Sequence, residues 1–315
     1  MKIIDPFYSV VAAIVAVILY AQSVAGDGRS KSKAGKGLGS AGAAEDWLRH
    51  GVLATTLVDD VYNLAEVPLV NGIARGLFES NVLGSSFFDD SAVWDIDIFS
   101  LVDTNADDII VDVELTSHVL EQEIISFIHG EFGGKEESKS GKRGNADPEA
   151  QFWLGIVGFG LTSRIIVDAG LSVGQTIPKA VFPSIVGRYG ISEIDATLWF
   201  EEICAISNNN GDEIGYDDLK THVLKHLGGQ FLKSGEQWIA VHEHVISQQF
   251  YSFAEVEFGV PLNLDSFGTA VETLEGRVIR ELGSNPLEVA AAFADADSDT
   301  DNLLSLTELS HIVIC

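Results

Sequence analysis

A run of twelve residues near the C-terminus, 297–308 with the sequence DSDTDNLLSLTE, constrains the fold of this chain more than any other feature. Side chains that carry oxygen recur through the run at positions 1, 3, 5, 9 and 12, which are Asp297, Asp299, Asp301, Ser305 and Glu308. The main-chain carbonyl of Leu303 would supply position 7. A tightly curled loop of this kind can place six or seven oxygens around one point, and Ca²⁺ prefers that number of oxygen ligands. The pattern therefore predicts a calcium-binding loop between two helices.

The residues that flank this loop favour helices on both sides. Phe293 lies four residues before the loop and Leu309 directly after it, so each helix can turn an apolar residue inward. Asn302 at position 6 tolerates the left-handed backbone that the turn needs, and Leu304 at position 8 suits a short pairing strand. The alternative, a solvated acidic turn, does not account for the agreement of all these positions.

An internal repeat places this loop in a larger pattern. Three segments open alike, each with a tryptophan in third place: EDWL at Trp47, QFWL at Trp153 and EQWI at Trp238. Packing of these tryptophans inside the repeat explains them better than ligand stacking. Each segment leads to a short apolar turn region, and an apolar residue follows 37 residues later. The pairs are Ile73 with Ile110, Ile177 with Ile214, and Phe267 with Leu304.

The repeat divides the chain into three modules that end in equivalent loops. We expect modules at 45–128, 151–227 and 236–315, separated by Gly-rich and charged linkers at 129–150 and 228–235. Each module is long enough for four helices of ordinary length. The predicted fold class is all-α, with helix-loop-helix pairs joined by short two-stranded contacts.

The first module ends in a second candidate loop, at residues 103–114. Its predicted ligands are Asp103, Asn105, Asp107, Glu114 and the main-chain carbonyl of Ile109. Asp108 stands where a turn glycine is usual, and Val111 offers no side-chain oxygen at position 9, where water often bridges to the ion. Loop 103–114 is expected to bind calcium more weakly than loop 297–308, because it carries one carboxylate fewer.

The middle loop, at residues 207–218, is the poorest in ligands. Its weaker predicted set is Ser207, Asn209, Asp218 and the main-chain carbonyl of Glu213. Only Asp218 brings a charge, and an aspartate at position 12 reaches an ion with both oxygens less readily than a glutamate. Two alternatives stay open for this loop, weak calcium binding and a structural loop that only pairs with its neighbour.

These loops resemble those of the EF-hand superfamily, and the resemblance covers the three modules but not the first 44 residues. The resemblance implies that helix-loop-helix units pair face to face through a contact at loop position 8. The upstream half of each module, around Ile73, Ile177 and Phe267, lacks ligand oxygens. Each module would then join a metal-free unit to a more complete one. The alternative is that the upstream helices are ordinary packing helices.

The N-terminus indicates secretion. Residues 1–25 contain Lys2, an apolar run from Phe7 to Ala21 and small residues around Ala25, which is typical of a cleaved signal peptide. An uncleaved anchor is disfavoured because the run is shorter than the roughly 20 residues of a spanning helix. Residues 26–44 are mostly Gly, Ser, Ala and Lys, which predicts a flexible linker. No later stretch is expected to span a membrane once the signal is cleaved.

Composition excludes some classes of function. The chain holds 47 acidic and 19 basic residues, a formal net charge of -28. Such a charge repels nucleic acid and anionic membrane surfaces and attracts cations. The chain contains neither a Gly-x-Ser-x-Gly elbow nor a Gly-Lys-Ser/Thr phosphate loop, and no enzyme activity is expected. His242 and His244 point about 200° apart on a helix, so they are expected to be a surface pair rather than metal ligands.

We therefore expect a secreted, acidic, extracellular protein with Ca²⁺ as its cofactor and a structural or interaction role in an extracellular or calcified matrix, where matrix proteins or mineral are the partners. The alternative is a calcium sensor or buffer in the lumen of the secretory pathway. The only methionine is Met1, whereas sensors that open on calcium usually grip targets with methionine-lined grooves. Cys204 and Cys315 could form a disulfide in an oxidising compartment.

Overall fold

The computed structural model describes residues 40–85, 87–88, 97–121, 128, 148–172, 174–209, 211–230, 232–278 and 286–313. This part of the chain is mostly helical, which confirms the all-α prediction. The predicted signal peptide, residues 26–39 and 129–147 of the predicted linkers, and Cys315 lie outside the described residues. Residues 40–44 were expected in the first linker and instead begin a helix.

The chain divides into two compact units that do not follow the order of the modules. Unit 1 comprises Met1–Leu83, Asp97–Ile125 and Ile246–Cys315, and unit 2 comprises Gly84–Ile96 and Ser126–Val245. Unit 1 thus draws on both the first and the third module, whereas most of unit 2 is the middle module. Loops 103–114 and 297–308 belong to unit 1, and loop 207–218 belongs to unit 2.

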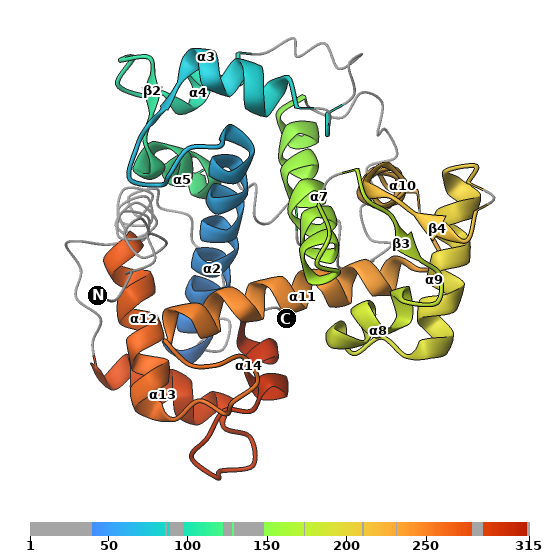
Figure 1. Ribbon diagram of the computed structural model, residues 1–315. Helices are drawn as coiled ribbons and strands as arrows, with labels where there is room; N and C mark the ends of the chain where they lie inside the picture. Colours follow the sequence, from blue (N-terminus) through green and yellow to red (C-terminus); the bar gives the residue numbers. More distant parts are fainter. Residues whose placement is uncertain are drawn as a thin grey trace, which may run out of the picture. The chain divides into compact units, whose positions relative to one another are not determined.

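Unit 1 is built around one long helix, α2 (Ser40–Ala65), drawn in blue in Figure 1. Every residue from Val52 to Val58 along α2 is buried, so this stretch of the helix is enclosed on all sides. Helices from both ends of the sequence pack on α2. The elements are β1 (Ile73–Ala74), α3 (Arg75–Leu77), η3 (Phe78–Leu83), α4 (Ile98–Val102), β2 (Ile109–Ile110), α5 (Asp112–Glu121), α12 (Leu264–Val278), α13 (Pro286–Ala296), α14 (Leu306–Val313) and the later part of α11 (Gly235–Phe253).

Unit 2 has a helical core rich in aromatic side chains. Its elements are α7 (Pro148–Asp168), β3 (Ile177–Pro178), α8 (Phe182–Val186), η4 (Gly187–Tyr189), α9 (Glu193–Ile206), β4 (Glu213–Ile214), α10 (Tyr216–Leu227) and the first part of α11. Trp199 and Trp238 meet edge to face with ring centres 4.9 Å apart. Trp153 is fully buried as well, as expected for tryptophans that pack inside the repeat.

Short antiparallel contacts join the two halves of each module. Ile73 pairs with Ile110 and Ile177 with Ile214, which are the partners that the 37-residue offset predicts. Figure 1 shows β3 and β4 lying side by side. In the third module Leu304 pairs with Leu262, so the predicted pairing with Phe267 is wrong. Phe267 lies inside α12, where its ring packs between those of Phe250 and Phe293 at 5.6 and 5.7 Å.

The sequence was expected to hold no membrane-spanning segment after the signal peptide, and helix α7 is the segment against which that expectation is compared. Among the described residues it is the one helix that is long and apolar enough to do so by length and composition. More than half of its most apolar stretch is buried inside the protein. A core helix of a soluble protein has the same properties, so α7 is weak evidence for a membrane span.

Candidate metal centre

Loop 297–308 gathers three carboxylates at one point. Oxygen atoms of Asp297, Asp299 and Glu308 all lie within 4.8 Å of one another. Three negative charges at that separation repel one another unless a cation or hydrogen-bond donors compensate them. Asp297 is buried, whereas Asp299 is exposed and Glu308 is half-buried. The cluster brings together the predicted ligands of positions 1, 3 and 12.

Main-chain N–H groups hold these carboxylates in place. Asp297 accepts hydrogen bonds from the amides of Asp301 and Asn302, at 3.1 and 2.9 Å. The amide of Asp301 also reaches Asp299 Oδ1 at 3.2 Å, and that of Leu303 reaches Asp301 Oδ1 at 2.8 Å. The loop can curl in this way because Thr300 and Asn302 adopt positive φ angles of 60° and 64°. The frame thus holds the predicted ligand carboxylates of the loop in place through main-chain amides.

Glu308 closes the loop from its far end. Its Oε1 accepts from the amide and hydroxyl of Ser298, and its Oε2 accepts from the amide and hydroxyl of Ser305. Hydrogen bonds from Ser305 and Ser298 lower the pKa of Glu308 to about 2. The carboxylate is therefore ionised at neutral pH and has both oxygens directed into the loop, as a bidentate ligand requires.

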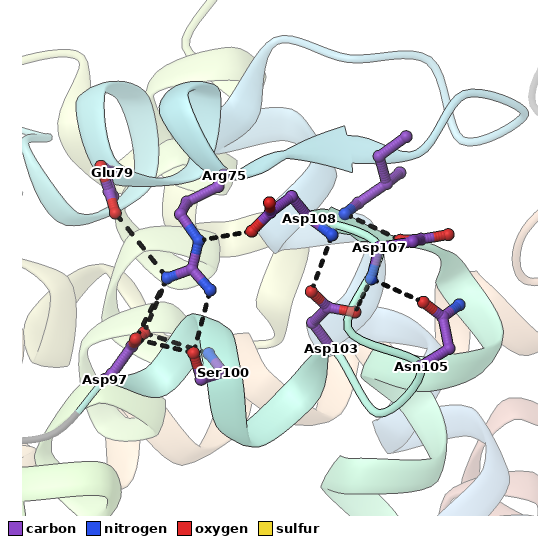
Figure 2. A network of polar contacts seen from close by, with 9 residues as sticks. Arg75, Glu79, Asp97, Ser100, Asp103, Asn105, Asp107 and Asp108 are labelled. Atoms are coloured by element: carbon purple, nitrogen blue, oxygen red, sulfur yellow. Dashed lines mark hydrogen bonds and ion pairs between the residues drawn. The ribbon is translucent and has the colours of Figure 1, made fainter.

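Loop 103–114 has the same hydrogen-bond frame, position for position (Figure 2). Asp103 accepts from the amides of Asp107 and Asp108 at 3.3 and 3.0 Å, and Asn105 Oδ1 accepts from Asp107 at 2.9 Å. Glu114 accepts from the amides at positions 2 and 9, as Glu308 does. Ala106 and Asp108 take the positive φ angles, 58° and 62°. Two loops of different sequence thus share one hydrogen-bond pattern.

Two carboxylates of loop 103–114, those of Asp103 and Glu114, are buried. Asp103 and Glu114 are only 6% and 8% exposed. Within the described part of the chain no Lys, Arg or His forms an ion pair with either of them, or with Asp297. A buried carboxylate is costly unless a cation or several donors compensate it. The frame supplies N–H donors but no positive charge, and oxygen ligands of this kind suit Ca²⁺.

Arg75 is a part of this centre that the sequence analysis missed. Its guanidinium donates to Asp108 Oδ1 at 2.9 Å, to Asp97 at 3.1 Å and to the hydroxyl of Ser100 at 2.9 Å, as Figure 2 shows. It also lies over the ring of Phe99 at 4.3 Å. Arg75 therefore ties the turn of loop 103–114 to the helix that enters it, because Asp97 caps α4 by accepting from the amide of Ser100.

The middle module has a related ion pair. Lys179 follows Ile177 by two residues, as Arg75 follows Ile73, and it donates to Glu201 at 2.9 Å. The main-chain amide of Lys179 donates a hydrogen bond to the carbonyl of Asp212 at 2.7 Å, and the main-chain amide of Arg75 donates to the carbonyl of Asp108 in the same way. A basic residue two places after each pairing isoleucine is the sequence signal that could have revealed both.

Loop 207–218 closes in a different way. The side-chain nitrogen of Asn209, at position 3, donates to the position 7 carbonyl of Glu213 at 2.9 Å and to Asp218 Oδ2 at 3.0 Å. Both acceptors are predicted ligands, so the amide group lies where an ion would have to bind them. Ser207 donates to the carbonyl of Asp218 at 3.3 Å. The weaker metal site stays a prediction, and these bonds favour a loop that closes without an ion.

Two other sequence expectations concern His242 with His244 and the cysteine Cys204. His242 and His244 were expected at the surface, which is wrong for His242 because it is buried. The ring of His244 packs edge to face on Tyr189 with centres 4.8 Å apart. Cys204 is buried, with its sulfur 3.8 Å from the carbonyl oxygen of Gly211.

Comparisons of the sequence with models of protein families and with curated proteins found no match, and a comparison with solved structures likewise found none.

Proposed function

We propose that this chain is a secreted, acidic protein of the EF-hand type that binds Ca²⁺ through loops 103–114 and 297–308. The observation that carries the proposal is the shared frame of the two loops, in which main-chain amides bind the carboxylates of Asp103 and Asp297, and neither carboxylate forms an ion pair within the described part of the chain. Loop 297–308 is the tighter site, since it brings four carboxylates and loop 103–114 brings three.

The short contacts at Ile110 and Ile214 support helix-loop-helix pairs in the first two modules. In each module a half without ligand oxygens pairs with the half that carries the loop. The upstream halves then act as scaffolds that fix the loop from one side. The contact between Leu262 and Leu304 gives the third module a similar support.

A structural or interaction role outside the cell fits these features better than a switch. Extracellular calcium is near millimolar, and sites in modules that work there have Kd values of roughly 0.1 to 1 mM, so they stay filled. The net charge of -28 suits a surface that faces cations, mineral or basic matrix partners. Recovery of the untagged protein only from inside cells, with its first 25 residues retained, would contradict secretion.

The test is a calorimetric titration of the whole chain with Ca²⁺. We expect two binding events, of which Asp297→Ala removes the tighter and Asp103→Ala the weaker, because position 1 contributes a central ligand. Glu272→Ala removes an exposed carboxylate of α12 outside the loops and serves as the matched control. If Asp297→Ala kept both events at unchanged affinity, the proposed function would be wrong.

A further inference from the structure

A short turn between η3 and α4 packs its aromatic side chains into unit 2. Unit 1 includes the chain up to Leu83 and again from Asp97, whereas Gly84–Ile96 belongs to unit 2. Phe87 and Phe88, which lie in this excursion, are 1% and 7% exposed. Two adjacent large apolar side chains buried in a connecting segment indicate a specific docking contact rather than a passive linker.

The turn is preorganised to present both rings. The hydroxyl of Ser85 accepts from the amide of Phe87 at 3.2 Å, and the carbonyl of Ser85 accepts from the amide of Phe88 at 3.0 Å. A serine whose oxygens accept from the amides two and three residues later is typical of a tight turn. The rings of Phe87 and Phe88 stand nearly perpendicular, at 88°, so they point into separate contacts.

Helices α7 and α10 form the surface that receives the two rings. Phe88 stacks on Phe152 of α7 at 5.6 Å with an interplanar angle of 14°. Phe87 meets Phe159 of α7 at 5.9 Å and Tyr216 of α10 at 6.1 Å, both edge to face. The ammonium group of Lys220 lies 5.5 Å from the centre of the Phe87 ring. Each ring thus has its own set of partners.

Two glycines of α7 make room for the rings. A Cβ at Gly155 would lie 2.9 Å from Phe88 Cδ1 and would overlap Cε1 of the same ring. A Cβ at Gly158 would lie 3.1 Å from Phe87 Cζ. Residues three apart share one face of a helix, and glycine inside a helix costs about 1 kcal/mol relative to alanine. The close fit of the rings accounts for glycine at both positions.

We propose that the facing surfaces of α7 and α10 form a seat for two adjacent phenylalanines, and that the chain's own turn at Phe87 and Phe88 is the resident ligand. The seat recognises a preformed turn that carries the rings at right angles. The inference does not rest on calcium binding: Tyr216 lies in loop 207–218, but none of the residues named is a predicted metal ligand.

The experiment supplies the ligand from outside. The full chain with Phe87→Ala and Phe88→Ala is titrated against a dye-labelled peptide of residues 82–92, and fluorescence anisotropy is followed. We expect saturable binding to the double variant and none to the unsubstituted chain, because the tethered turn competes at an effective concentration in the millimolar range. A peptide with both phenylalanines replaced by alanine should not bind.

Glycine variants test the seat itself. Adding Gly155→Ala to the double variant should weaken peptide binding at least about tenfold, because the new methyl group occupies the place of the Phe88 ring. Gly187→Ala is the control, since a Cβ there meets no atom within 4 Å. If the folded double variant bound both peptides alike, or neither, the proposal would be overturned.

If the double variant does not fold, a second measurement tests whether α7 and α10 form a specific seat for the turn. Hydrogen exchange of the Phe87 and Phe88 amides is compared in chains that carry Gly155→Ala or Gly187→Ala alone. Displacement of the turn should speed exchange at both amides in the first variant and leave it unchanged in the second. Equal exchange in the two variants would contradict a specific seat.

Discussion

At the scale of single residues, the three loops differ in what lies at the ion position. The carboxylates of Asp297 and Asp103 accept hydrogen bonds from main-chain amides of their own loops. In loop 207–218 the side-chain amide of Asn209 instead donates to the carbonyl of Glu213 and to the carboxylate of Asp218. An amide is a neutral donor, so it satisfies two acceptors without a counter-charge. The middle loop gains stability from a side chain in the place where the others would gain it from calcium.

Asn209→Asp should make the stability of unit 2 depend on calcium. The new carboxylate loses both donated hydrogen bonds and faces Asp218, so we expect unfolding without calcium to become easier by about 1 to 3 kcal/mol. Millimolar calcium should restore part of that loss, because the loop then holds two carboxylates. Urea unfolding with and without calcium measures both effects. Asn209→Ala is the control, and equal rescue of the two variants would contradict the role given to the amide.

The buried imidazole of His222 should make the stability of the protein depend on pH. Its Nδ1 accepts from Trp238 Nε1 at 2.7 Å and its Nε2 contacts the Ser234 hydroxyl at 3.1 Å. Burial lowers the pKa of His222 to about 4. The negative charge of Glu202 opposes this shift, and the positive charges of His226 and Lys225 add to it. The unfolded chain therefore binds the proton more readily, and stability is fully present above about pH 6.5 and lost as pH falls toward 4.

Over that range the loss should reach about 3 kcal/mol from His222 alone. Urea unfolding at several pH values measures it, and the chain with His222→Gln separates it from other groups. Glutamine can accept from Trp238 and donate to Ser234 but does not titrate. The slope of stability against pH should therefore be shallower in the variant. An unchanged slope would show that another group causes the pH dependence.

At the scale of elements, the two-residue strands fix the loops more than their length suggests. Ile73 is fully buried and pairs with Ile110, the residue at position 8 of loop 103–114. Ile73→Ala should destabilise unit 1 by about 2 to 5 kcal/mol, because it opens a cavity behind the loop. Denaturant unfolding measures that loss, and calorimetry should show weaker calcium binding at loop 103–114.

Val70→Ala is the control for this substitution. Val70 lies three residues upstream of Ile73 and is 64% exposed, so its truncation should change stability by less than about 0.5 kcal/mol. A cost as large as that of Ile73→Ala would mean that the region responds to any loss of volume and not to the strand contact.

The sequence allowed the prediction of two of these strand contacts and not of the third. The offset of 37 residues located the partners of Ile110 and Ile214, because buried isoleucines recur with the loops. Phe267 stands at the same offset from Leu304, but aromatic contacts with Phe250 and Phe293 place it in a helix. A single apolar residue does not show whether it will pair in a strand or pack in a helix.

The candidate site was predictable to the same degree. The predicted ligand positions in loops 103–114 and 297–308 rest on the order of oxygen-bearing residues along the chain, and the hydrogen-bond frames of the two loops agree with that order. Arg75 was missed because its partner Asp108 lies 33 residues later, and the contact emerges only when the pairing of Ile73 with Ile110 is combined with the basic residue two places after Ile73. The closure of loop 207–218 by Asn209 could not be predicted from the sequence either. An asparagine at position 3 can coordinate an ion through its oxygen or donate hydrogen bonds to neighbouring residues through its nitrogen.

At the scale of the whole molecule, both stronger loops belong to unit 1 although nearly 200 residues separate them in sequence. Calcium binding stabilises only what folds around the ion, by about 1.4 kcal/mol for each site at a concentration ten times its Kd. Calcium should therefore protect unit 1 from hydrogen exchange and leave unit 2 unchanged. Hydrogen exchange followed by mass spectrometry, with Mg²⁺ as the control ion, measures the difference. Equal protection of both units would contradict the assignment of the sites.

The division of unit 1 along the chain also bears on the order in which the protein can be made. Helix α2 packs on α13 and α14, which are synthesised some 200 residues later, whereas the described helices of unit 2 are complete by the middle of α11. Domains generally fold as units while the chain emerges from the ribosome. The apolar side chains of α2 that pack on α13 and α14 must therefore wait for residues 286–313, and during that time they are exposed to solvent and to chaperones.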